Sequence, residues 1–202
     1  MAPTSEHRDG QPNRSIVISG PSGVVKDTLI KRLKDAHPSK FSTIVSHTTR
    51  QKRPDEKEGV DYCFISSTQF RSMIHWEEFV EHTIYNGHHY GTSERAVRLE
   101  LKIGGTLLLD INIGGVKSLQ RSQSLNPRYV FIRPPNLDAL KARLKARGTE
   151  DEESIKGRLA EAEAELEFAE TAGIFDMIII NDDLDEAYRH LEEFACDNNY
   201  PG

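Results

Sequence analysis

Short apolar runs rich in β-branched residues recur along the chain, and helical periodicity follows each of them. The first run is Ser15–Ser19, after which Leu29, Ile30 and Leu33 repeat at helical spacing up to about Ala36. Runs of the same kind, which predict strands buried on both faces, lie at residues 105–110, 128–133 and 176–181. Because strands that alternate with helices form parallel sheets, the pattern predicts an α/β fold.

Two helices near the C-terminal end carry recognisable start signals. Thr149 and Glu152 have the spacing of a capping box, and Asp183 and Glu186 have the same spacing. The expected apolar face of the first of these helices consists of Ile155, Leu159, Ala162, Leu166 and Ala169. The pattern therefore predicts one helix after Thr149 and a final helix after Asp183.

Residues 46–93 differ in composition and hydrophobic pattern from the segments on either side of them. They mix basic residues, aromatic residues and turn formers, with short strands such as Asp61–Ile65 between polar loops. We therefore expect an inserted lobe at residues 46–93, within a core made of residues 15–45 and 94–198.

Two polar segments are expected to lie outside the packed core. Residues 1–14 are rich in Pro, Ser, Asn, Gly and charge, so they bury too little apolar surface to offset their ordering entropy. We expect them to form a disordered tail. Residues 146–153 are densely charged and predict a solvated flap, which forms the first part of a lid at about residues 146–158.

Composition narrows the class of protein. The chain has 202 residues, 37% of them apolar, which suits one compact domain. A formal net charge of −6 provides no basic field for a nucleic-acid backbone. No apolar run approaches the roughly 18 residues of a membrane span, so we expect a cytoplasmic protein without membrane or nucleic-acid partners. Cys63 and Cys196 have no second pair, which predicts two free thiols.

A glycine-rich loop, Gly20-Pro-Ser-Gly23, separates the first predicted strand from the first predicted helix. Free backbone N–H groups and the positive end of the helix dipole converge in such a loop, which makes it an anion cradle. Gly20 and Lys26 fit the P-loop pattern G-x-x-x-x-G-K-[ST]. Val25 replaces the second glycine, and Asp27 replaces the hydroxyl that binds magnesium. A strand-to-helix turn without a ligand therefore stays open as an alternative.

A series of short motifs occurs in order between Ser15 and about Phe194. They are the SGPSG loop at 19–23, SHTTR at 46–50 with Arg53, GVDY at 59–62, FVEH at 79–82, YGTS at 90–93, LD at 109–110, RGTE at 147–150 and INDD at 180–183. Through these motifs the sequence resembles the guanylate kinase family. The resemblance implies a P-loop three-layer sandwich with a parallel central sheet, an inserted lobe that binds a nucleoside monophosphate, and a short lid that carries arginines.

The resemblance also implies a GMP site in the inserted lobe. Guanidinium groups suit a phosphate dianion, and a carboxylate accepts hydrogen bonds from N1–H and the exocyclic amine of guanine. By resemblance, the GMP-binding residues are Arg50, Arg53, Tyr62 and Tyr90 at the phosphate and Ser46, Glu81 and Thr92 at guanine. Asn112 stands where the family has an Asp that helps to hold guanine, and Gly114 stands where Gln is common. Because an amide both donates and accepts, Asn112 allows a shifted base preference.

On the other side of the site, the resemblance implies binding of ATP with Mg²⁺. The implied residues are Lys26, Arg143, Arg147 and Arg158 for catalysis, Gly20, Ser22, Gly23 and Asn181 for ATP, and Asp110 for the metal, to which Asp27 adds a second carboxylate. Two alternatives stay open. The arginines could instead pair with the acidic run at 150–153, and Asp110 could cap the turn after its strand.

The two changes in the glycine loop predict weakened phosphoryl transfer. Val25 is β-branched and poorly suited to positive φ, and Asp27 would repel a phosphate about 4 Å away by about 4 kcal/mol at an effective dielectric near 20. We therefore expect a pseudokinase with a degraded P-loop, whose lobe binds GMP or another phosphorylated ligand for a different reaction or for binding alone. The alternative is a guanylate kinase that converts GMP and ATP into GDP. We expect a monomer in both cases.

Overall fold

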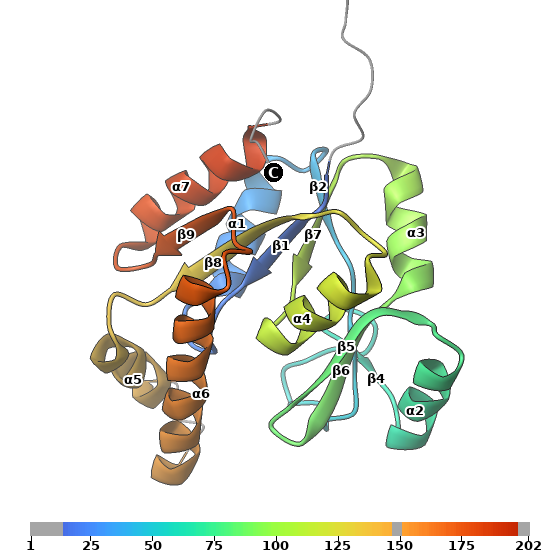
Figure 1. Cartoon of the computed structure of the whole chain (residues 1–202), viewed down its shortest axis with the longest axis horizontal. Coiled ribbons are helices and arrows are strands. Elements are labelled where there is room, and N and C mark those ends of the chain that lie inside the picture. Colours follow the sequence, from blue (N-terminus) through green and yellow to red (C-terminus); the bar gives the residue numbers. More distant parts are fainter. Residues whose placement is uncertain (1–13, 147–150, 198–202) are drawn as a thin grey trace, which may run out of the picture.

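The computed structural model describes residues 14–146 and 151–197 of the chain, which form a parallel sheet covered by helices and a second, smaller sheet beside it (Figure 1). The parallel sheet has the strand order β2-β7-β1-β8-β9. Its strands are β1 (Ile16–Ser19), β2 (Phe41–Thr43), β7 (Thr106–Asp110), β8 (Arg128–Arg133) and β9 (Met177–Ile180). The predicted α/β fold with a parallel central sheet is confirmed.

Helices cover both faces of this sheet because side chains alternate along each strand. Ile16 and Ile18 of β1 face a core that includes α1 (Lys26–Ala36) and α7 (Leu184–Cys196). Val17, between them, faces a second core with α3 (Glu94–Ile103) and α4 (Ile113–Ser122). The remaining core helices, α5 (Leu137–Ala146) and α6 (Glu152–Thr171), pack against each other. The result is the predicted three-layer sandwich.

The prediction that residues 176–181 form a strand buried on both faces is wrong for one face. Ile179 is 1% exposed, whereas Ile178 and Ile180 are 39% and 55% exposed. Ile179 lies in the core that α7 covers, whereas the opposite face of β9, an edge strand of the sheet, is left open to solvent. The apolar run predicts the strand correctly but not its place in the sheet.

The start of α6 also differs from the expectation. Its N-cap is Asp151, whose side chain accepts a hydrogen bond from the Ser154 backbone N–H at 2.8 Å. Thr149, the predicted cap, lies outside the described residues. For α7 the expectation is confirmed, because the Asp183 side chain accepts hydrogen bonds from the first-turn backbone N–H groups.

The second sheet is formed entirely by residues within 46–93, the segment predicted to be an inserted lobe. Its strand order is β4-β3-β6-β5, and α2 packs beside it. Its elements are β3 (His47–Thr48), β4 (Cys63–Phe64), α2 (Ser67–His75), β5 (Phe79–Tyr85) and β6 (His88–Ser93). The strand predicted at Asp61–Ile65 is therefore only two residues long. We call this small sheet with α2 the lobe.

The lobe meets the core along the free edge of β5, which α4 covers. The His82 backbone N–H donates to Ser118 Oγ at 3.2 Å, and Ser122 Oγ donates to the Val80 carbonyl at 3.0 Å. The two elements approach so closely that a Cβ at Gly114 would lie 2.1 Å from Thr83 Oγ1. Gly114 thus allows α4 to satisfy backbone groups that an edge strand would otherwise expose.

Some predictions fall on parts of the chain that the structure does not describe. The predicted tail lies outside the described residues except for Arg14, whose guanidinium donates to the Pro127 carbonyl at 2.9 Å. The centre of the predicted lid, residues 147–150 with Arg147, also lies outside them. Both cysteines are described and are free thiols, as predicted. No helix in the described part of the chain is long and apolar enough to cross a membrane.

Candidate active site

A cavity of about 600 Å³ lies where the glycine loop, the lobe, the start of α4 and the start of α6 meet. Its size is typical of small-molecule sites. Of the residues predicted from sequence, it is lined by Gly20, Ser22, Gly23, Lys26, Asp27, Ser46, Arg50, Arg53, Tyr62, Glu81, Tyr90, Asp110, Asn112 and Arg158. Residues far apart in the chain are thus brought to one site.

The glycine loop wraps closely around the Lys26 ammonium group. Lys26 Nζ donates to the Gly20 carbonyl at 2.7 Å and lies 3.9 Å from Asp110 Oδ1. A side chain at Gly20 is impossible, since its Cβ would lie 2.1 Å from the Ile132 carbonyl oxygen. The loop therefore holds a cation at the end of the cavity where the first helix begins, within ion-pair distance of Asp110.

Val25 adopts the left-handed conformation, with φ 66° and ψ 34°. A non-glycine residue pays roughly 1–2 kcal/mol for this conformation. The expectation that this position requires positive φ is confirmed, and the backbone keeps the required shape despite the β-branched side chain. The strain is accommodated within the loop.

Asp27 and Asp110 place two carboxyl groups side by side at the same end of the cavity. Burial, and secondarily the neighbouring Asp27 carboxylate, raise the pKa of Asp110 to about 6, although Lys26 opposes the shift. Carboxylate oxygens are ligands that Mg²⁺ prefers, and this ion usually takes only one or two of them together with substrate phosphates. Within the described ranges no cluster of three or more His, Cys, Asp or Glu could hold a metal ion alone. The pair fits a magnesium ion that phosphate oxygens also bind.

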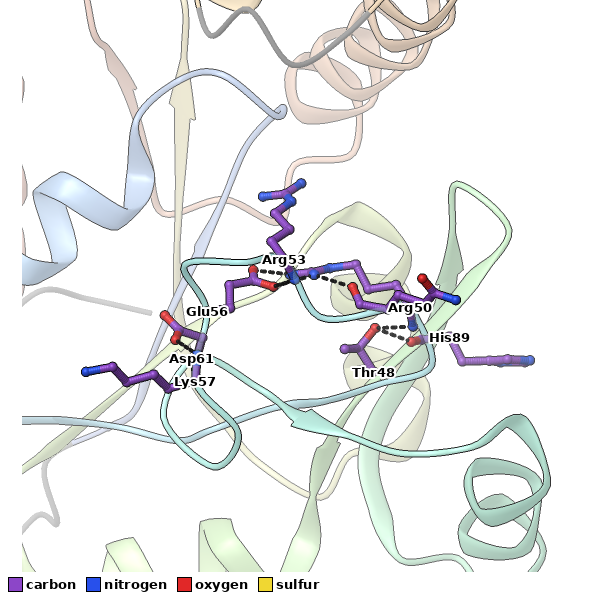
Figure 2. A network of polar contacts seen from close by, with 8 residues as sticks. Thr48, Arg50, Arg53, Glu56, Lys57, Asp61 and His89 are labelled. Atoms are coloured by element: carbon purple, nitrogen blue, oxygen red, sulfur yellow. Dashed lines mark hydrogen bonds and ion pairs between the residues drawn. The ribbon is translucent and has the colours of Figure 1, made fainter.

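In the lobe, Arg50 is held in a partly buried ion pair with Glu56 (Figure 2). Arg50 Nη1 donates to Glu56 Oε2 at 2.6 Å, and the guanidinium lies 4.9 Å from the Tyr62 ring centroid. The hydrogen bonds from Arg50 lower the pKa of Glu56 to about 2. Figure 2 shows the Arg53 side chain pointing away from this ion pair, and Arg53 also lines the cavity. Two guanidinium groups therefore line one part of the cavity, and their chemistry suits an anion; we call Arg50 and Arg53 the guanidinium wall.

Sequence reasoning did not identify Glu56. Besides its ion pair with Arg50, Glu56 Oε2 accepts a hydrogen bond from the Arg53 backbone N–H at 2.8 Å. The carboxylate thus fixes both the guanidinium of one arginine and the backbone of the other. An acidic residue within a basic turn was the available signal, but its partner depended on how the turn folds.

The base-reading residues predicted for the lobe gather around Glu81, which is 3% exposed. Burial raises the pKa of Glu81 to about 7, and the Thr92 hydroxyl donates a hydrogen bond to its carboxylate. Thr92 lies behind Glu81 rather than on the cavity surface. Asn112 is the N-cap of α4, because its Oδ1 accepts from the Gly115 N–H at 2.9 Å. Asn112 also lines the cavity.

Polar residues that sequence reasoning missed also line the cavity, among them Thr83, Tyr85, Glu161 and Glu165. Thr83 and Tyr85 lie two and four residues after Glu81 on β5, so the period of a strand puts them on the same face. Glu161 and Glu165 lie three and seven residues after Arg158, which places them on one face of α6. Both periodicities were signals in the sequence.

Arg158 connects α6 to the glycine loop. Its Nη1 donates to Ser22 Oγ at 2.6 Å. Arg158, which the sequence predicts to be a catalytic residue near the lid, thus lies directly beside the glycine loop.

Arg143 and Asn181 lie behind the glycine loop and do not line the cavity. Arg143 Nη2 donates to the Asn181 carbonyl at 2.8 Å, and Asn181 Nδ2 donates to the Val24 carbonyl at 2.9 Å. Asn181 is 2% exposed. In this structure the two residues brace the loop backbone, so the contacts to ATP and to the transferred group expected from sequence are not seen for them.

Comparisons with known proteins agree on one family. The family model described as "Guanylate kinase" matches residues 12–198. The guanylate kinase of Sus scrofa is 45% identical over 184 residues, which cover 91% of this chain and 92% of that protein. That of Schizosaccharomyces pombe is 42% identical over 179 residues, covering 89% and 88%. A crystal structure of guanylate kinase from Anaplasma phagocytophilum superposes with a TM-score of 0.70 at 25% identity, covering 92% of this chain and 85% of that one.

Proposed function

Because the chain belongs to the guanylate kinase family, we propose that it transfers a phosphoryl group from ATP to GMP, giving ADP and GDP. The observation that carries this proposal is that one cavity contains both the glycine loop with Lys26 and the guanidinium wall of Arg50 and Arg53. Two anion-binding sites that share one cavity suit two phosphorylated substrates.

GMP would bind in the lobe. Arg50 and Arg53 provide charged donors for the nucleotide phosphate, and the hydroxyl of Tyr62 adds a neutral donor because burial raises its pKa to about 12. Glu81 is buried without a cationic partner among the described residues, so its carboxylate is costly unless donors reach it. The N1–H and amino groups of guanine are such donors, which supports guanine as the base.

ATP would bind at the glycine loop. Lys26 and the backbone N–H groups of the loop hold the phosphates, and Arg158 lies where it neutralises charge that develops on the transferred group. Asp27 and Asp110 would hold Mg²⁺, which supplies further neutralisation of the phosphates. A Mg²⁺ ion held by these carboxylates would offset the repulsion between Asp27 and phosphate.

Loss of phosphoryl transfer, expected from Val25 and Asp27, has less support than the working kinase. Relatives that cover most of the chain are named guanylate kinases. The loop also keeps the left-handed backbone at Val25 and keeps Lys26 at the cavity. A lobe that binds GMP without turnover remains the competing outcome, because Asp27 adds negative charge where ATP must bind.

The test uses the purified full chain. Calorimetry with GMP and with Mg-ATP separately measures binding, and a coupled assay for ADP, with GMP omitted as the control, measures transfer. We expect both ligands to bind and ADP to form only when GMP is present. GMP binding without ATP binding or ADP formation would overturn the proposal in favour of a pseudokinase.

A further inference from the structure

Glu161 joins the lobe to α6 across the cavity. With its amide nitrogen facing α6, Asn86 donates to the Glu161 carboxylate at 3.0 Å and 3.3 Å. Burial, together with the nearby Glu161 carboxylate, raises the pKa of the Tyr85 hydroxyl, and both side chains line the cavity. Tyr85 ends β5 and Asn86 lies in the turn before β6, so both residues belong to the tip of one hairpin. One side chain of α6 thus accepts hydrogen bonds from the Asn86 amide and lies near the Tyr85 hydroxyl.

From Tyr85 a chain of ring contacts leads to the guanidinium wall. The Tyr85 and Tyr90 ring centroids lie 6.3 Å apart and those of Tyr90 and Tyr62 lie 6.0 Å apart, with the rings edge to face in both pairs. Arg50 then lies over Tyr62. Each contact is of the kind that stabilises aromatic clusters. A continuous series of contacts thus runs from Tyr85 to Arg50.

On its own helix, Glu161 shares a face with Arg158, three residues earlier, which contacts Ser22 of the glycine loop. Hydrogen bonds from Glu161 to the hairpin thus link the lobe to the same helix that reaches the glycine loop. The two ends of the cavity are connected through α6.

The charge of Glu161 does not by itself explain why a carboxylate lines this cavity. Glu161 lines a cavity that we propose binds phosphates, and a negative charge there opposes the binding of anions. Contact with a phosphate is therefore unfavourable for Glu161, whereas a carboxylate suits the hydrogen bonds that the hairpin donates.

We propose that Glu161 is a positioning residue, which ties the hairpin tip at Tyr85 and Asn86 to α6 and so holds the guanidinium wall in place for the acceptor phosphate. This inference rests on the proposed function, because it treats the wall as part of the GMP site.

The test combines kinetics with hydrogen exchange. Glu161→Ala removes the acceptor, Glu161→Gln keeps an acceptor oxygen, and Tyr85→Phe removes one donor hydroxyl while keeping the ring. Glu163→Ala is the matched control, since Glu163 lies on the same helix, is exposed and does not line the cavity.

For Glu161→Ala we expect the KM for GMP to rise about tenfold, as the loss of hydrogen bonds to a charged group predicts. The KM for Mg-ATP should change less than about threefold. Glu161→Gln should restore most of the wild-type KM for GMP. Tyr85→Phe should raise this KM in the wild-type background and have no effect in the Glu161→Ala background. An unchanged or lowered KM in Glu161→Ala, or additive effects in the double variant, would overturn the proposal.

Hydrogen exchange of residues 82–90, measured without nucleotide, separates this inference from the proposed function. We expect exchange in this segment to be about fivefold faster in Glu161→Ala than in the wild type or Glu163→Ala, because local opening becomes easier. If the wild type forms no GDP, the proposed function fails while this measurement still decides the inference. Equal exchange in Glu161→Ala and the wild type would refute the bridge itself.

Discussion

Glu81 on β5 accepts a hydrogen bond from the hydroxyl of Thr92 on β6, and both side chains are buried. The register of the two strands sets this contact, because Glu81 and Thr92 are direct neighbours in the antiparallel ladder. The Glu81 carboxylate is thereby fixed at the lobe end of the cavity, where we propose that guanine binds.

The raised pKa of Glu81 makes stability depend on pH. The folded protein keeps this proton up to a pKa of about 7, whereas the unfolded chain releases it near 4.5. Stability therefore falls as the pH rises from 4.5 to 7, and the loss persists above 7. Glu81→Gln has no such proton, so its stability relative to the wild type should increase by about 3 kcal/mol between pH 4.5 and pH 8.

Urea unfolding at pH 4.5 and at pH 8 measures this difference. The same variant should raise the KM for GMP by about a hundredfold, since the acceptor of two guanine donors is replaced by an amide. A relative stability that does not change with pH would show that Glu81 is not buried as the structure places it.

The Arg50–Glu56 pair predicts the opposite dependence on pH. The folded-state pKa of Glu56 is about 2, below the ordinary value of 4.5, so its stabilisation is complete above 4.5 and is lost as the pH falls towards 2. Glu56→Gln should destabilise the protein by about 2 kcal/mol at pH 7 and raise the KM for GMP about tenfold. Thermal melts at pH 7 and pH 3 should show a smaller difference from the wild type at pH 3. An equal difference at both values would contradict the ion pair.

Substitutions in the glycine loop test directly whether Val25 and Asp27 reduce phosphoryl transfer. If the chain is a working guanylate kinase, Val25→Gly combined with Asp27→Ser should raise ADP formation by less than about tenfold. An increase of several orders of magnitude would instead indicate that these residues had abolished transfer. Val25→Gly alone should not destabilise the protein, because relief of roughly 1–2 kcal/mol of left-handed strain offsets the flexibility of glycine. Thermal melting checks that second expectation.

Gly114 and Gly157 form a matched pair of helical glycines. Alanine at Gly114 would place Cβ 2.1 Å from Thr83 Oγ1, whereas nothing lies within 4 Å of a Cβ at Gly157. Gly114→Ala should destabilise the protein by about 2 kcal/mol through overpacking, and Gly157→Ala should stabilise it by up to about 1 kcal/mol through helix propensity. Denaturant titration compares the two variants. Stabilisation by Gly114→Ala would mean that α4 and β5 are not in contact.

Local pattern was sufficient for β1, β7, β8 and α7 and for the glycine loop. The apolar run at 128–133 matches β8 at both ends, and Asp183 begins α7 as its side chain predicts. The same kind of run at 176–181 did not reveal that Ile178 and Ile180 are exposed. Periodicity reports how a segment alternates between core and solvent, but edge position depends on which strands pair with it.

By itself, the sequence determined the parallel α/β fold, the segment that forms the lobe, and most residues that line the cavity, because these follow from hydrophobic periodicity and from ordered motifs. Only the tertiary structure decided which polar groups meet. It paired Arg50 with Glu56, set Arg143 and Asn181 behind the loop, and brought Glu161 to the hairpin of the lobe. Such contacts join side chains from separate elements, so they depend on how those elements pack rather than on the local sequence of either one.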